Sequence, residues 1–148
     1  MKKPFWFYLL LIVMLLQAVG GLAGGIIMVI APSGSIMQFP ENTLAKSPFG
    51  SFLIPGLILF ILLGVIPAIT LYGLIKQPNW PLLERLNLYK EQHWSWMFSI
   101  YTSVMLTIWL NIEAMYIGYD FLQTVYGLLS VSILVFTLIP PVKRYFQR

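Results

Sequence analysis

The chain has 148 residues, of which 59% are hydrophobic and 9% are charged, and its net charge is +4. Soluble domains of this length are far less apolar, so the composition predicts one transmembrane domain over residues 1–148. The absence of cysteine excludes disulfides, thiolate catalysis and cysteine-bound metal centres. The basic residues do not form one cluster, which argues against nucleic acid as a partner.

Four stretches are long and apolar enough to cross a bilayer: about residues 5–31, 52–75, 96–118 and 121–140. Roughly 20 apolar residues are needed, because a helix rises about 1.5 Å per residue and the hydrocarbon core is about 30 Å thick. The first run is longer than the core of a secretory signal, so we expect it to be retained. The predicted fold is all-α, a polytopic four-transmembrane-helix antiparallel bundle. Its connections are an outer loop at 32–51 and an inner interfacial loop at 76–95.

Basic residues are distributed unevenly between the two sides of this predicted bundle. One side carries Lys2, Lys3, Lys76, Arg85, Lys90, Lys143, Arg144 and Arg148, and the other carries only Lys46. Short cytoplasmic loops are enriched in Lys and Arg, so both termini are predicted to be cytoplasmic.

The first span contains a stripe of small residues with one amide beside it. The stripe consists of Gly20, Gly21, Gly24 and Gly25, and Gln17 lies about one turn before it. Small residues at this spacing let a second helix approach closely within a membrane. We expect these residues to pack helices together, either within the bundle or between two copies of the chain, with Gln17 making an interhelical hydrogen bond.

Pro67 lies well inside the second span. A proline cannot donate its backbone hydrogen bond, so it frees the carbonyl of Leu63. A kink or a local widening is expected there, with Thr70 or a neighbouring helix compensating. The two interpretations are a static kink and a hinge of a transport cycle.

The third span carries two polar stripes at helical spacing. Ser103, Thr107 and Asn111 recur every four residues and form a face expected to pack on another helix. The other stripe includes Trp109, Glu113, Tyr116 and Asp120.

Glu113 is the only acid within a predicted span, and it falls roughly 25 Å above the inner boundary, near the outer one. A charge near the membrane edge can reach water, whereas one at the centre is costly. Glu113 is therefore either a structural acid, hydrogen-bonded to Tyr116 or to Gln123 and Thr124, or part of an outward-facing ligand or proton site.

Residues for conventional catalysis are sparse. His93 is the only histidine and has no partner at motif spacing, so an interfacial anchor is favoured over a catalytic base. It lies on the opposite membrane side from Glu113, which argues against a shared metal site. We expect no catalytic residue, metal or cofactor, and an enzyme is less favoured than a non-enzymatic protein.

Glycine and proline punctuate the first half of the chain in a recurring pattern. The motifs are Gly20-Gly21-Leu22 to Pro32-Ser33-Gly34, then Ser47-Pro48-Phe49, Phe52-Leu53-Ile54-Pro55-Gly56 and Gly64. This pattern resembles small uncharacterised bacterial four-helix integral membrane proteins, and the resemblance implies a four-helix fold without an activity. Small multidrug transporters also have four helices, but their essential glutamate lies in the first helix, where this chain has Gln17.

The predicted function is an accessory or interaction role within the bilayer, as a multi-pass protein of a bacterial plasma membrane. Its expected partners are the lipid bilayer and either another membrane protein or a second copy of the chain. The alternative is a small-molecule or lipid-binding protein, or a transporter, with an outer-leaflet pocket lined by Trp109, Glu113, Tyr116 and Asp120 and covered by the loop at 32–51. A third hypothesis is an intramembrane enzyme that uses Glu113 as acid or base.

Overall fold

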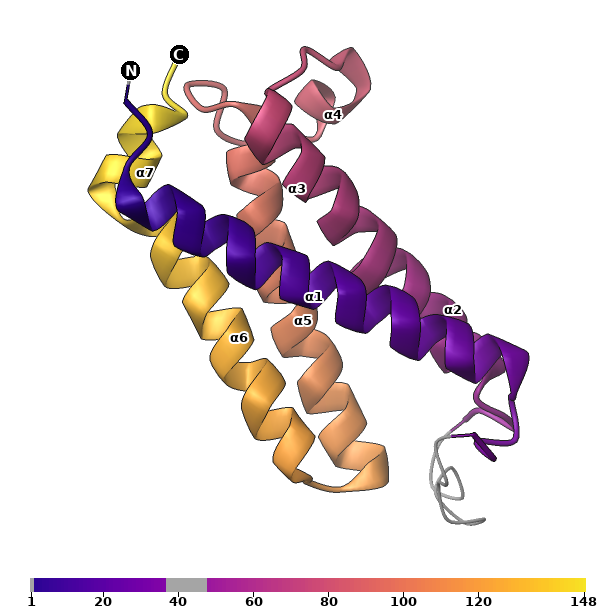
Figure 1. Cartoon of the computed structure of the whole chain (residues 1–148). Helices are drawn as coiled ribbons and strands as arrows, with labels where there is room; N and C mark the ends of the chain where they lie inside the picture. Colours follow the sequence, from indigo (N-terminus) through magenta and orange to yellow (C-terminus); the bar gives the residue numbers. More distant parts are fainter. Residues whose placement is uncertain (1, 37–47) are drawn as a thin grey trace.

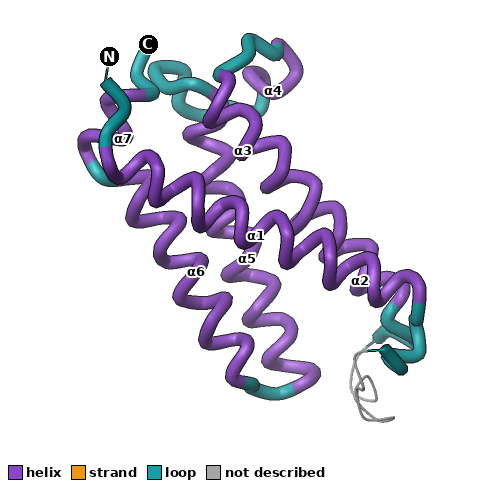
Figure 2. The backbone as a smooth tube through the Cα atoms, viewed as in Figure 1, coloured by secondary structure: helices purple, strands orange, loops and turns teal. Residues whose placement is uncertain are grey.

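The computed structural model describes residues 2–36 and 48–148, with side chains except those of residues 116 and 117. The described residues form helices and loops and contain no strand, which confirms the all-helical prediction (Figures 1 and 2). Three helical stretches are long and apolar enough to cross a membrane: Phe5–Ile30, Leu53–Lys76 and Phe121–Leu138. Residues 37–47 of the predicted outer loop lie outside the described residues.

The helices follow one another along the chain as α1 (Phe5–Ile30), α2 (Leu53–Phe60), the π-helix η1 (Ile61–Val65), α3 (Ile66–Lys76), α4 (Pro81–Arg85), α5 (Trp94–Ile117), α6 (Phe121–Leu138) and α7 (Pro140–Tyr145). α2, η1 and α3 are continuous. The α5 helix has 24 residues, comparable with the three apolar stretches, but it carries more polar side chains.

Two helix ends differ from the predicted boundaries for local reasons. α5 begins at Trp94, two residues before the predicted start, because the His93 side chain accepts a hydrogen bond from the Ser95 N–H and so caps the helix. α6 ends at Leu138, two residues before the predicted end. Ile139 has an extended ψ of 130° ahead of Pro140, and a residue before proline avoids the helical conformation. The short helix α7 then continues in a new direction.

The long helices form two hairpins (Figure 1). α1 packs on α2, η1 and α3, and α5 packs on α6, while the hairpins meet where α1 contacts α6 and α3 contacts α5. The chain termini lie together at one end, which we call the termini end, near α4 and α7 (Figure 1). At the opposite, far end the ribbons of the two hairpins diverge in the orientation of Figures 1 and 2.

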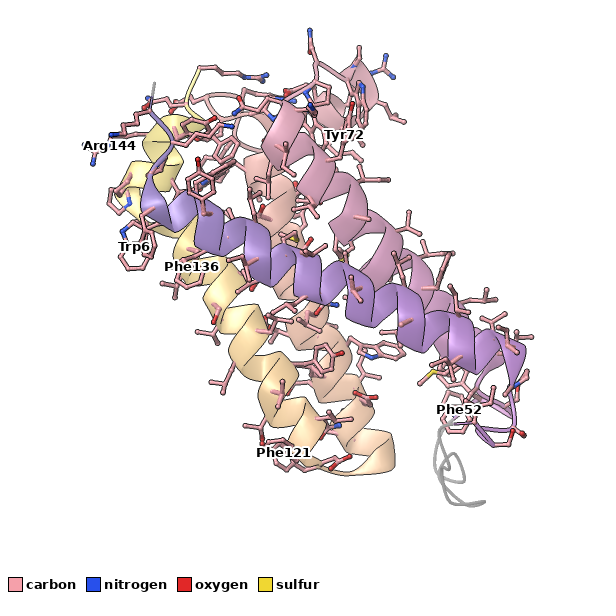
Figure 3. The ribbon with its side chains drawn as sticks, in the orientation of Figure 1. Trp6, Phe52, Tyr72, Phe121, Phe136 and Arg144 are labelled. Carbon is pink, nitrogen blue, oxygen red and sulfur yellow. The ribbon has the colours of Figure 1, made fainter. Side chains whose placement is uncertain are left out.

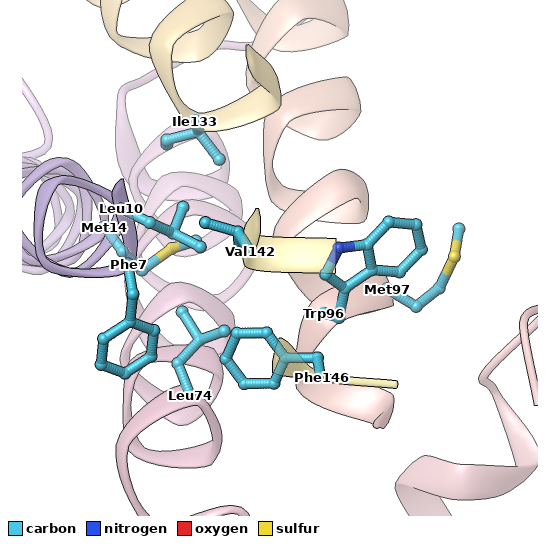
Figure 4. Packing of buried hydrophobic residues seen from close by; sticks show 9 residues of the cluster. All are labelled: Phe7, Leu10, Met14, Leu74, Trp96, Met97, Ile133, Val142 and Phe146. Carbon is cyan, nitrogen blue, oxygen red and sulfur yellow. The ribbon is translucent and has the colours of Figure 1, made fainter. Parts of the chain in front are cut away.

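The buried apolar core lies towards the termini end, where all the long helices meet. Its members come from α1, α3, α5, α6 and α7 and comprise Phe7, Leu10, Met14, Leu74, Trp96, Met97, Ile133, Val142 and Phe146 (Figure 4). Aromatic rings connect its parts, since the Phe7 ring lies 5.1 Å from the Tyr145 ring and 5.8 Å from the Phe146 ring. This core joins the two hairpins into one body.

The α1 and α2–η1 backbones approach each other very closely along a glycine seam. A Cβ atom added to Gly21 would lie 1.8 Å from the Leu63 carbonyl oxygen, and one added to Gly25 would lie 2.6 Å from the Phe60 Cβ. From the other helix, a Cβ on Gly64 would lie 2.8 Å from the Leu22 nitrogen. Only glycine leaves room for this contact, which is the close approach that small residues permit between membrane helices.

Candidate functional site

The widened turn η1 is the irregular point of the second long helix, and Pro67 is its cause. Pro67 has no N–H to give to the Leu63 carbonyl, and the chain forms a π-turn over Ile61–Val65 just before it. The Gln17 Nε2 of α1 donates to this Leu63 oxygen over 2.9 Å. The carbonyl left without its helical donor is therefore satisfied by the neighbouring helix, in a buried place.

Gln17 is nearly completely buried, with 1% of its surface exposed. Its Nε2 is bonded to Leu63, whereas its Oε1 has no hydrogen-bond partner among the described residues. Thr70 is also buried, and its hydroxyl donates to the Ile66 carbonyl over 2.8 Å. The helix break thus carries hydrogen bonds both within α3 and from α1, and the static kink and the hinge both stay predictions.

The first α5 stripe faces α6 through hydroxyl groups. Ser103 Oγ donates to the Ser130 carbonyl over 2.9 Å, and Ser130 Oγ donates back to the Ser103 carbonyl over 2.9 Å. Thr107 Oγ1 lies 2.7 Å from Ser130 Oγ. These bonds join the second hairpin in the same way that the glycines and Gln17 join the first.

Asn111, the next residue of this stripe, does not reach α6. It is exposed, and its Nδ2 donates over 2.8 Å to the Thr107 carbonyl of its own helix. No other described residue forms a hydrogen bond with the Asn111 amide group. Asn111 therefore presents a polar side chain on the outer surface of α5.

The second α5 stripe leads to the acids at the far end. Glu113 is half-buried, faces the Gln123 side chain, and lies close enough to Asp120 for their charges to interact. Asp120 caps α6, because its Oδ1 accepts the Phe121 N–H over 2.6 Å. Gln123 completes a capping box by accepting the Asp120 N–H at its Oε1 over 3.0 Å. The acids and the amide thus support the start of α6.

The structure describes the other residues of the predicted pocket only in part. Trp109 is half-buried one turn before Glu113. The Tyr116 side chain and the segment 37–47, which was expected to cover the pocket, lie outside the described residues. The ligand and proton-site hypotheses therefore stay predictions, while the described contacts give Asp120 and Gln123 a structural role.

A polar network at the termini end was not predicted from the sequence. Glu84 accepts two bonds from Arg148, with its Oε1 2.8 Å from Nη1 and its Oε2 2.5 Å from Nη2. Its Oε1 also accepts the Trp94 N–H over 3.2 Å. Burial alone would raise the pKa of Glu84, but the Arg148 hydrogen bond and charge, with smaller contributions from Asn87 and Trp94, bring it below its ordinary value. Glu84 and Arg148 are 64 residues apart, so no local pattern indicates this pair.

His93 connects the same network to the preceding loop. Its Nε2 lies 3.0 Å from the Pro78 carbonyl oxygen, which also accepts the Trp94 indole N–H over 2.8 Å. Since a carbonyl only accepts, Nε2 carries the proton, and since the Ser95 N–H only donates, Nδ1 is unprotonated. These hydrogen bonds are those of the neutral Nε2–H tautomer of His93, which caps α5.

We expect the protein to lose stability as the pH falls below about 6.5, the ordinary pKa of histidine. Burial lowers the pKa of His93, and the Pro78 carbonyl and Glu84 counteract this only in part, with Arg148 acting in the same sense as burial. A depressed pKa in the folded state means that the unfolded state binds the proton more readily, so stability is complete above 6.5 and decreases below it. Thermal unfolding in detergent micelles, followed by circular dichroism at pH 7.5 and 5.5, measures this.

The matched variant is His93→Asn, which keeps a capping oxygen but does not titrate. Its melting temperature should change less between the two pH values than that of the unmodified protein. An equal change in both proteins would show that His93 does not cause the loss.

No group of three or more His, Asp and Glu side chains suited to a metal ion occurs within the described part of the chain. These helices define the class of the protein: an all-helical chain with three helices able to span a membrane. Comparisons with protein families, curated proteins and solved structures give no match to this chain. Its function is therefore inferred from its own residues and contacts.

Proposed function

We propose that the protein is a non-enzymatic, multi-pass protein of a bacterial plasma membrane that acts by binding another membrane protein or a second copy of itself. In this proposal α5 is a fourth span, so that four helices form an antiparallel bundle with both termini in the cytoplasm. Two features support it. First, α5 packs on α6 and, with 24 residues, is comparable in length with the apolar helices. Second, every Lys and Arg except Lys46 lies in the chain ends or in the connection at 76–95, which the proposal places on the cytoplasmic side.

Asn111 is the observation that carries the proposed interaction. In a bundle that spans the membrane, this exposed amide lies two residues before Glu113, below the outer boundary. A polar side chain facing lipid is costly, whereas the same group between helices forms a hydrogen bond. Its neighbours Val104, Ile108 and Ile112 are exposed and apolar, as expected for a surface that packs on another helix.

The far end of α5 favours this role over ligand binding. Asp120 and Gln123 are engaged in capping α6, and Glu113 faces Gln123. A ligand at these groups would have to replace contacts that hold the start of α6. Asn111 has no comparable duty, because its described bond is made within its own helix.

Photo-crosslinking from position 111 tests the proposal. A photoreactive amino acid in place of Asn111 should give a discrete protein adduct in native membranes, and an adduct of twice the monomer mass would identify a second copy of the chain. The control position is Ile12, an exposed residue of α1 outside the proposed surface.

Asn111→Leu should weaken the association roughly threefold to thirtyfold, the range expected from about 0.6–2 kcal/mol for one interhelical hydrogen bond. Glu113→Gln should leave the association unchanged. Equal adducts from positions 111 and 12, or full association of the leucine variant, would contradict the proposal. Loss of association in the Glu113→Gln variant alone would favour a site at Glu113 instead.

A further inference from the structure

An exposed basic patch lies where α1 begins beside α7. We call it the inner-edge patch, and its members are Lys2, Lys3, Trp6, Lys143 and Arg144. Aromatic packing brings these distant segments together, since the Phe7 ring contacts the Tyr145 and Phe146 rings. The Lys3 Nζ lies 5.8 Å from the Phe7 ring. Figure 3 shows Arg144 and Trp6 at the same edge of the molecule.

The patch carries four cationic side chains and no acid. Residues 2–8 and 140–146 contain no Asp or Glu. The one ion pair within the described residues, Glu84–Arg148, lies elsewhere at this end. Arg144 donates its Nε to the Pro140 carbonyl over 3.3 Å, which leaves its terminal nitrogens to bind an anion, and Lys143 lies 6.0 Å from the Trp96 ring with its side chain exposed. The patch is thus suited to a phosphate-bearing partner.

Apolar surface continues from this charged patch along the helices. Trp6 is 39% exposed and its ring lies 5.9 Å from the Phe136 ring, while the exposed Phe5 ring lies 5.7 Å from that of Trp6. Tryptophan favours the level of the lipid headgroups, with its ring against apolar surface and its N–H in a polar environment. Charged and apolar parts therefore follow one another in the order that a phospholipid presents its phosphate and its acyl chains.

We propose that the inner-edge patch binds an anionic phospholipid of the cytoplasmic leaflet, with the phosphate between the α1 and α7 cations and an acyl chain along Phe5, Trp6 and Phe136. This inference rests on the proposed orientation in the membrane. The inner-edge patch is separate from the surface around Asn111 on α5, so the two proposals concern different parts of the protein.

Native mass spectrometry of the purified full chain tests this binding independently of its orientation in a cell. The protein is released from micelles that contain equal amounts of phosphatidylglycerol and phosphatidylcholine. The unmodified protein should retain phosphatidylglycerol preferentially. Each cation near an anionic lipid surface contributes about fivefold in affinity. Lys143→Gln combined with Arg144→Gln should therefore reduce the preference at least tenfold.

The matched control is Lys76→Gln combined with Arg85→Gln, which removes the same charge from the opposite side of the termini end and should keep the preference. Inorganic phosphate at millimolar concentration should not displace the lipid, because it lacks the acyl contacts. Equal retention of both lipids, equal loss in both double variants, or displacement by inorganic phosphate would overturn the proposal. Circular dichroism of each variant separates loss of binding from loss of folding.

Orientation is measured in a separate experiment, because the chain has no native cysteine. Gln147→Cys and Tyr119→Cys, each at an exposed position outside the patch, should react with a membrane-impermeant reagent from the cytoplasmic and the outer side, respectively. Reversed labelling with intact lipid preference would overturn the proposed topology and the choice of leaflet, while keeping the binding site.

Discussion

Gly21→Ala should destabilise the protein by roughly 3 kcal/mol or more, the largest effect that we expect from adding one methyl group. The new Cβ would lie 1.8 Å from the Leu63 carbonyl oxygen, and this neighbour is backbone that no rotamer change can move away. The helices must separate, which also lengthens the Gln17–Leu63 hydrogen bond. Thermal unfolding in micelles measures the loss, and a bulkier residue at this position should prevent folding.

Two other glycines serve as controls for this change. A Cβ on Gly24, in the same stripe of α1, would meet only the end of the Leu59 side chain at 3.2 Å, so Gly24→Ala should have a small effect. A Cβ on Gly127 of α6 would meet nothing within 4 Å, so alanine should be tolerated there. Similar losses at Gly21 and Gly127 would contradict the close contact between α1 and η1.

Gln17→Leu should cost about 1–3 kcal/mol, because it leaves the Leu63 carbonyl without a donor in a buried, apolar place. The reason lies in α3, where Pro67 lacks the N–H that would otherwise bond to this carbonyl. Unfolding free energies of the single variant and the unmodified protein measure the cost.

A double-mutant cycle with Pro67→Ala distinguishes this cause from simple loss of packing. The alanine restores an N–H four residues after Leu63, so Gln17→Leu should cost less in the Pro67→Ala background. An unchanged cost would mean that the Leu63 carbonyl does not depend on Gln17. A coupling energy above about 0.5 kcal/mol would support the proposed replacement of one donor by the other.

The helix break shows how far the sequence alone leads. Pro67 predicted a kink or a local widening and identified the Leu63 carbonyl as the group left unpaired, and the structure has a π-turn directly before it. The pattern on α1 also indicated an interhelical hydrogen bond from Gln17. That these two groups bind each other depends on the relative rotation and depth of two helices, which periodicity within each helix does not specify.

The termini end illustrates what the sequence could not indicate. Glu84, His93 and Arg148 lie in three different segments, and none has a partner at helical or motif spacing. Their network depends on α7 turning at Ile139, which brings the end of the chain onto the loop before α5. Pro140 and Pro141 signal the end of α6 but not the direction that follows. Of the predicted pocket and its covering loop, the Tyr116 side chain and residues 37–47 lie outside the described part of the chain.

The division into two hairpins also bears on how the chain is synthesised. Gln17 on α1 finds its acceptor, Leu63, on the next long helix, and Ser103 on α5 finds Ser130 on the helix that follows it. Each of these polar groups is thus matched by the next long helix to leave the ribosome. In the proposed four-span arrangement, neither group would wait in lipid for the other half of the chain, because each partner follows it directly in the order of translation.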